Sequence, residues 1–234
     1  MPFSWPAVVL LLLLLLSSSD GAVYYNYRSI HDISSPIRAG QTTWGLSNGL
    51  KGTFLNETSK IVKMSTHMGT HVDSPAHAYQ KMFKGHDVAA LNIHTLNGPV
   101  LLVDVPGKKN ITGNVLKSLK LPKGLKRVIF RTDNTRRGLM RRKEFELGYV
   151  GLEPDGANWL IKHTEIKLIG MDYLSVAASS KTVEVHKILL NKGDVIPLEG
   201  LDLEEIAAGK YALQCLPMKI PGADGAPTRC VLLE

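Results

Sequence analysis

Short apolar runs alternate with helical patterns in the part of the chain beyond residue 100. Four runs are rich in Val, Ile and Leu and are bounded by Gly, Pro or Asp, which predicts buried strands at 100–105, 128–131, 166–171 and 212–216. Thr112 is a good N-cap, and a helix after it would place Val115 and Leu119 on one face. A second helix is expected after Pro154, because the first helical turn does not need the N–H that proline lacks. This alternation predicts an α/β fold.

The region before residue 100 is more typical of strands and loops than of helices, and no stretch resembles an interdomain linker. Of the 234 residues, 44% are hydrophobic and 21% are charged, which is ordinary for a globular protein and argues against disorder. We therefore expect one α/β domain over residues 23–234.

The N-terminus carries an unbroken apolar run of ten residues, from Ala7 to Leu16, followed by small and polar residues. The run is too short to cross a bilayer, which favours a secretory signal peptide over residues 1–22. An uncleaved membrane anchor is the alternative. Sequons at Asn56 and Asn110 are candidate glycosylation sites and agree with secretion to the extracellular space. After cleavage we expect no association with a membrane.

The chain has two cysteines, Cys215 and Cys230, so its fold does not depend on a disulfide framework. One bridge in an oxidising compartment and two buried free thiols are both compatible with the sequence.

The formal net charge is +7, and part of it lies in one basic cluster: Arg136, Arg137, Arg141, Arg142 and Lys143. The cluster has no interleaved aromatic residues, zinc-finger spacing or recognition-helix pattern, so we expect no nucleic-acid partner. A solvated basic face is the favoured interpretation, and attraction to an acidic extracellular polymer is the alternative.

The segment 65–77 holds the most informative pattern, because His67, His71, Asp73 and His77 fall within eleven residues. In an extended chain, these odd-numbered residues would all point to one side. A glycine and a proline within the segment argue against a helix. Four imidazole and carboxylate groups on one face predict a metal site, and this donor set suits zinc, manganese or iron.

Two further residues are candidate ligands. His186 follows an apparent loop at 178–185, and Glu199 lies in the short apolar stretch 195–200. A buried carboxylate is costly unless it is paired or bound to metal. Glu199 is therefore either a metal ligand or a strand-end residue that faces solvent.

The pattern H-x-G-T-H-x-D-x-P-x-H at residues 67–77 resembles the signature of the cyclase family. That family includes bacterial kynurenine formamidases, isatin hydrolases and plant cyclase-like proteins. Residues 32–34, 172–177 and 195–203 resemble further segments of the family, so the likeness extends over most of the mature chain and is closest to the secreted plant branch.

The resemblance implies a single compact α/β domain of swivelling β/β/α type that assembles as a homo-oligomer. It implies two divalent ions per chain, zinc or manganese, with Asp73 bridging them and His77 as proton donor and acceptor. Trp44 is a loose counterpart of the family's substrate-stacking aromatic residue. The implied metal ligands are His67, His71, Asp73, His186 and Glu199.

The implied activity is metal-dependent hydrolysis of an amide bond, of the arylformamidase type, with N-formylkynurenine or a related small amide or lactam as substrate. Two alternatives stay open from the sequence. One is a secreted metal-binding interaction protein without turnover, and the other is a hydrolase of isatin-like cyclic amides.

Overall fold

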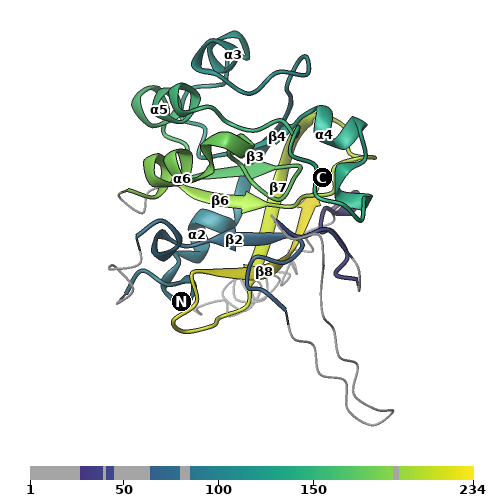
Figure 1. Cartoon of the computed structure of the whole chain (residues 1–234). Helices are drawn as coiled ribbons and strands as arrows, with labels where there is room; N and C mark the ends of the chain where they lie inside the picture. The colour runs from purple at the N-terminus through teal and green to yellow at the C-terminus, as the bar shows by residue number, and fades with distance from the viewer. Residues whose placement is uncertain (1–26, 39–40, 45–63, 80–84, 192–194) are drawn as a thin grey trace, which may run out of the picture.

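Eight strands form one mixed sheet in the computed structural model, which describes residues 27–38, 41–44, 64–79, 85–191 and 195–234 (Figure 1). The segment 1–22 and Asn56 lie outside the described residues. The order along the sheet is β1 (Ile30–Asp32), β8 (Gly225–Leu233), β2 (His71–Asp73), β6 (Ile196–Glu199), β5 (Leu168–Met171), β4 (Arg127–Arg131), β3 (Gly98–Asp104) and β7 (Gly209–Pro217). Strand β7 also pairs with β8, which closes the sheet into a barrel.

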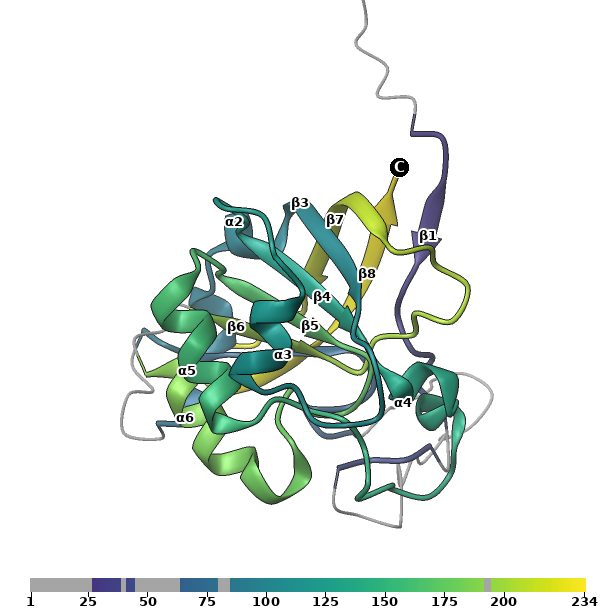
Figure 2. The ribbon, with the colours of Figure 1, turned by 90° about the horizontal axis from the view of Figure 1, so that it is seen from above.

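Strands β3, β4, β5 and β6 run parallel. Strand β2 pairs antiparallel with β6, β7 pairs antiparallel with β3, and β8 pairs antiparallel with both β2 and β7. Three helices pack together on one side of these parallel strands: α3 (Gly113–Ser118), α5 (Pro154–His163) and α6 (Thr182–Leu190) (Figure 2). The remaining helices are short: α2 (Ile93–Leu96), α4 (Asp133–Arg136), and the 3-10 helices η1 (Pro75–His77), η3 (Val88–Ala90), η4 (Leu139–Arg141) and η5 (Ser179–Lys181). The α/β class expected from the sequence is confirmed.

The four apolar runs all form strands, as predicted. Each run has the length of a strand, is apolar enough to be buried and is bounded by turn residues. The Thr112 hydroxyl accepts a hydrogen bond from the Val115 N–H at 3.3 Å and so caps α3. Helix α5 begins at Pro154. The last strand, β8, has no counterpart among the predicted elements.

The barrel and its helices enclose two hydrophobic cores. One fills the barrel interior and includes Val72, Ile129, Leu198 and Leu232. The other lies between the sheet and the helices and includes Phe130. Adjacent residues of β4, Ile129 and Phe130, belong to different cores because successive side chains of a strand point to opposite faces.

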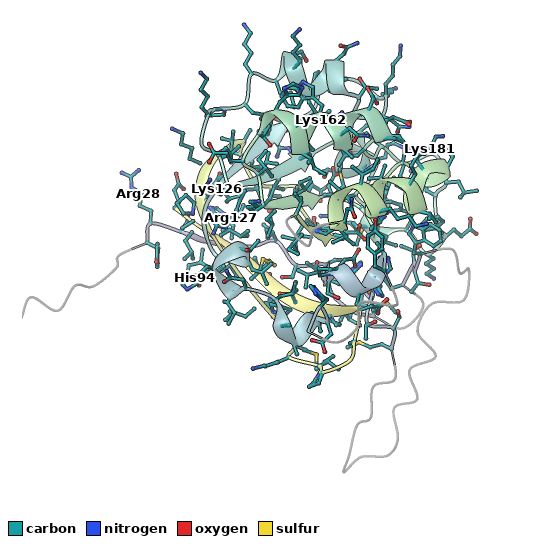
Figure 3. The ribbon with its side chains drawn as sticks, turned by 90° about the vertical axis from the view of Figure 1, so that its left-hand side faces the viewer. Arg28, His94, Lys126, Arg127, Lys162 and Lys181 are labelled. Atoms are coloured by element: carbon teal, nitrogen blue, oxygen red, sulfur yellow. A yellow bond between two sulfur atoms is a disulfide. The ribbon has the colours of Figure 1, made fainter. Side chains whose placement is uncertain are left out.

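Arg127, at the start of β4, connects the short helix α2 to the barrel through hydrogen bonds. Its guanidinium donates from Nε to the Thr95 carbonyl at 2.8 Å and from Nη2 to the carbonyl of His94 (Figure 3). Carbonyls at a helix end have no partner within the helix, so a cation there satisfies them. Gly98 has a φ of +126°, and a Cβ at that position would lie 3.0 Å from Arg127 Nη1.

The basic cluster is largely neutralised by acids. Arg136 pairs with Asp133 at 2.6 Å, and Arg137 and Arg142 both pair with Glu146. Arg141 pairs with Glu204 and Asp202. These pairs agree with a solvated face rather than a free cationic surface. No helix in the described part of the chain combines the length and apolar character needed to cross a membrane.

Cys215 and Cys230 form a disulfide, so the first of the two interpretations of the cysteines applies. They face each other directly across β7 and β8, with 4.3 Å between their Cα atoms. Neither exchanges backbone hydrogen bonds with the other: the Cys215 N–H donates to Asn97 and the Cys230 N–H to Ser34. The bridge therefore supports the barrel at a cross-strand position that lacks ladder bonds.

Replacing both cysteines with alanine is expected to lower the free energy of unfolding by about 3 kcal/mol, because a bridge spanning roughly 15 residues restricts the unfolded chain by that amount. Urea denaturation of the double variant and the wild type measures the difference. Reducing agent should lower the wild-type midpoint and leave the variant unchanged. Equal midpoints for the two proteins without reductant would contradict the prediction.

Candidate metal centre

The segment 65–77 does not form one extended strand, so the predicted conformation is wrong in its extent. Only His71–Asp73 is strand; the chain turns at Gly69, with a φ of +62°, and enters a 3-10 helix at Pro75. A Cβ at Gly69 would also lie 3.1 Å from Ile37. A left-handed glycine and a proline both favour turns over strand.

The four side chains converge despite these turns. The ring centroids of His67 and His71 are 5.2 Å apart, and those of His67 and His77 are 4.4 Å apart. Asp73 lies between them, fully buried, with Oδ1 2.9 Å from His67 Nδ1 and Oδ2 3.9 Å from His77 Nε2. The side chains that the sequence grouped into one site therefore lie close together in the fold.

Glu199 reaches the site because β2 pairs with β6, which places His71 directly opposite it. The carboxylate is 3% exposed, so it does not face solvent. Its Oε2 lies 3.2 Å from His71 Nε2, and its Oε1 accepts a hydrogen bond from the Val176 N–H at 2.8 Å. Gly200 follows with a φ of +71°, and a Cβ there would lie 2.3 Å from the Gly69 carbonyl oxygen. Glycine at both positions lets the two turns meet.

His186 lies on helix α6, which begins at Thr182, so the predicted loop at 178–185 is wrong for its second half. The buried residues of this helix, Val185, His186, Leu189 and Leu190, recur at helical spacing, and this pattern was available in the sequence. His186 Nε2 lies 3.1 Å from Glu199 Oε1 and 3.3 Å from Asp73 Oδ2.

Backbone carbonyls orient the two buried imidazoles. His71 Nδ1 lies 2.9 Å from the Gly69 carbonyl oxygen, and His186 Nδ1 lies 2.7 Å from that of Thr182. Each Nδ1 must donate in this contact, which leaves Nε2 to face the carboxylates. Histidines that bind metal commonly have their second nitrogen held in this way.

The charges of the cluster depend on one another. Burial alone would raise the pKa of Asp73, but His77, His186 and His67 hold it well below its usual range. Burial alone would lower the pKa of His67, but hydrogen bonds and charge from Asp224 and Asp73 raise it to about 10. Burial likewise opposes ionisation of His186, whose pKa is raised well above its usual value by Asp73 and Glu199. A metal ion that binds here must displace protons from these imidazoles.

The residues fit a metal ion. Two buried atoms of predicted ligands, Asp73 Oδ2 and His67 Nε2, have no hydrogen-bond partner of normal geometry among the described residues. Two sets of ligand atoms lie within 4.8 Å of one another: His67, Asp73 and His77, and His71, Asp73 and Glu199. Asp73 belongs to both sets, as a residue that bridges two ions would. Imidazole nitrogens with carboxylate oxygens suit zinc or manganese.

Asp224 is a site residue that the sequence did not reveal. It lies immediately before β8, with Oδ2 3.0 Å from His77 Nδ1 and Oδ1 3.1 Å from His67 Nε2. A Cβ at the next residue, Gly225, would lie 2.5 Å from His67 Cε1, so only glycine leaves room for that ring. An Asp-Gly pair indicates a turn, and nothing else in its surroundings marks it as functional.

Two other predicted residues lie in the described part of the chain. The Trp44 ring is 43% exposed and packs 5.7 Å from Phe145. Trp44 also lies near the Tyr149 hydroxyl, as does Thr182, the residue whose carbonyl orients His186. The Asn110 side-chain amide donates to Glu153 at 2.6 Å, so the nitrogen that would carry a glycan is hydrogen-bonded in the folded chain.

Comparison with known proteins places this chain in a family. A family model named Cyclase, described as "Putative cyclase", matches residues 31–178. Cyclase-like protein 3 of Arabidopsis thaliana is 45% identical over 223 residues, covering 91% of this chain and 82% of the relative. The kynurenine formamidase of Erythrobacter litoralis is 32% identical over 216 residues, covering 88% of this chain and 94% of the relative.

A solved structure described as a predicted metal-dependent hydrolase from Bacillus stearothermophilus superposes with a TM-score of 0.72 at 26% identity. The likeness covers 88% of this chain and 98% of that one. The match to the family model includes residues 67–77, the segment with three of the site histidines. The chain belongs to the cyclase family.

Proposed function

We propose that this protein is a metal-dependent hydrolase of small amides, of the arylformamidase type. The observation that carries the proposal is the buried cluster in which Asp73 lies within contact distance of His67 and His186, with His77 at its exposed side. The kynurenine formamidase of Erythrobacter litoralis, which is 32% identical to this chain, supports the same reaction class.

Two divalent ions would be held by His67, His71, Asp73, His186 and Glu199. An ion bound to such ligands lowers the pKa of a coordinated water and polarises the carbonyl oxygen of a substrate. The carboxylates of Asp73 and Glu199 are acceptor-only when ionised, and they keep the imidazole Nε2 atoms of His71 and His186 turned towards the same space.

His77 is suited to move the proton. Its Nδ1 lies 3.0 Å from Asp224 Oδ2, and its Nε2 faces the ligand cluster, 3.9 Å from Asp73 Oδ2. Hydrolysis adds water across the C–N bond: the carbonyl carbon gains the oxygen, and the nitrogen leaves with a proton. His77 Nε2 accepts a proton from the attacking water and returns it to the departing nitrogen, and imidazole has a reference pKa near neutrality that suits both steps. The ring is 30% exposed, so a substrate can approach it.

The relatives and the aromatic residues near the site support an aryl amide as the substrate class. Trp44, Phe145, Tyr149 and Tyr173 form a continuous set of ring contacts, with centroid separations of 4.8 to 5.9 Å. Planar rings of this kind stack on an aryl group. Trp44 is the most exposed large side chain of the set and is proposed to contact the aryl ring of the substrate.

We also propose that the protein is secreted. The apolar run from Ala7 to Leu16 supports a cleaved signal peptide, and the Cys215–Cys230 bridge supports an oxidising compartment. Mass spectrometry of protein collected from the culture medium of a eukaryotic host tests the cleavage site near residues 19–22 and the state of Asn56 and Asn110.

Purified protein should hydrolyse N-formylkynurenine, and a chelator should abolish the activity until zinc or manganese is restored. Absorbance at the product's wavelength measures the rate, and elemental analysis measures metal per chain. Bound metal without hydrolysis of this substrate, or of a panel of formamides, esters and lactams, would favour the binding protein without turnover. Hydrolysis of an isatin-like lactam alone would move the substrate class to cyclic amides.

A further inference from the structure

Asp224 is held rigidly beside the metal centre by its backbone. The Ser74 N–H donates to the Asp224 carbonyl at 2.9 Å, and the Ser74 hydroxyl donates to the same oxygen at 3.0 Å. The next residue, Gly225, pairs with Asp73 in the antiparallel ladder between β2 and β8. The position of Asp224 is thus fixed by the strand that carries the shared ligand Asp73.

Its carboxylate spans two imidazoles. One oxygen lies 3.0 Å from His77 Nδ1 in normal hydrogen-bond geometry, and the other lies 3.1 Å from His67 Nε2. The second contact is short but poorly aligned, since His67 Nε2 has no hydrogen bond of normal geometry among the described residues. The well-formed interaction of Asp224 is therefore the one with His77.

Apart from Asp224, few groups orient the ring of His77. It ends the three-residue helix η1, and its side chain is 30% exposed. Among the described residues, the one hydrogen-bond partner of its ring is Asp224. A neutral imidazole can carry its proton on either nitrogen, and the partner of one nitrogen decides which tautomer is present.

We infer that Asp224 is a positioning residue that holds His77 in the Nδ1–H tautomer, with Nε2 directed at the reacting atoms. The inference rests on the proposed function, in which His77 Nε2 transfers the proton. A carboxylate performs this role because it only accepts hydrogen bonds, so the imidazole nitrogen beside it must carry the proton. Asparagine at the same place can donate instead and so favour the opposite tautomer.

Replacing Asp224 with asparagine tests the inference in zinc-loaded protein. We expect kcat to fall about 10- to 100-fold, as is typical when the partner of a site histidine is removed, with KM and metal content nearly unchanged. Glutamate at position 224 should recover part of the turnover because it restores an acceptor-only group. Asp87→Asn is the matched control, because the Asp87 carboxylate accepts from the Gly222 N–H in the same loop and from the Ala90 N–H, away from the site histidines.

Ring-nitrogen NMR of protein with ¹⁵N-labelled histidine reads the tautomer without any substrate. In the wild type, His77 should be protonated at Nδ1, and in the asparagine variant this signal should move to Nε2 or split between the two. An unchanged tautomer would overturn the inference even if turnover fell. Loss of metal in the variant would also overturn it, because Asp224 would then act through His67. If no substrate is hydrolysed by the wild type, the proposed function fails, while the NMR result still decides the role of Asp224.

Discussion

Replacing His77 with alanine is expected to lower kcat for N-formylkynurenine by about 10²- to 10⁴-fold, the usual contribution of a positioned acid or base. The metal should stay bound, because the two buried ligands His71 and His186 are oriented by backbone carbonyls and not by His77. The two measurements that check this are steady-state kinetics and elemental analysis of the same preparation.

His94→Ala is a suitable control for His77→Ala. His94 is exposed on α2, and alanine would keep both of its backbone hydrogen bonds, from its N–H to Asn92 and from Arg127 to its carbonyl. Wild-type turnover by the His77 variant would show that another group moves the proton. Loss of metal from this variant would instead place His77 among the ligands, since its Nε2 lies close enough to Asp73 to share an ion.

Asp73→Asn is expected to have the largest effect on metal binding. Asp73 is fully buried, and it is the one residue present in both sets of ligand atoms found in the described chain. Asparagine has nearly the same shape, so the variant can pack, but it lacks the negative charge that the proposed pair of divalent ions would need between them. We expect metal content after desalting to fall from about two ions per chain towards zero, and turnover with it.

Elemental analysis after gel filtration measures this loss, and circular dichroism confirms that the variant is folded. Asp104→Asn serves as the control, since Asp104 pairs with Arg131 at 2.5 Å on the surface and contacts no histidine. A fully loaded Asp73 variant would show that the metal is held elsewhere. Partial loss, to about one ion per chain, would show that the carboxylate is needed at only one of the two positions.

Local patterns in the sequence were sufficient to predict the α/β class and the four apolar strands, because burial and turn residues act over a few positions. They also grouped His67, His71, Asp73 and His77 into one site. These side chains lie close together even though the backbone of the segment is not extended as predicted. The predicted extended conformation of residues 65–77 is wrong at Gly69 and Pro75, because the chain turns at each of these residues. Helix α6 was missed because its first turn is rich in β-branched residues, which favour strands.

The parts of the site that could not be predicted from the sequence depend on pairing between strands that lie far apart along the chain. Strand β2 has only three residues, and its neighbours in the sheet are β6 and β8, more than 120 residues later in the chain. Glu199 becomes a buried neighbour of His71 and His186, and Asp224 a partner of two histidines, only through this pairing. No local pattern marks Asp224, since Asp-Gly pairs are found in ordinary turns.

The position of β8 beside β2 in the barrel determines when the site is completed during synthesis and folding. During synthesis, His67, His71 and Asp73 leave the ribosome long before either strand that will flank them, and β8 is the last strand to emerge. Contacts between such distant segments form late, because the chain must first close a long loop. The nascent polypeptide therefore offers three loosely held donors rather than a selective site. The full set of donors comes together only in the finished barrel, after β6 and β8 have paired with β2.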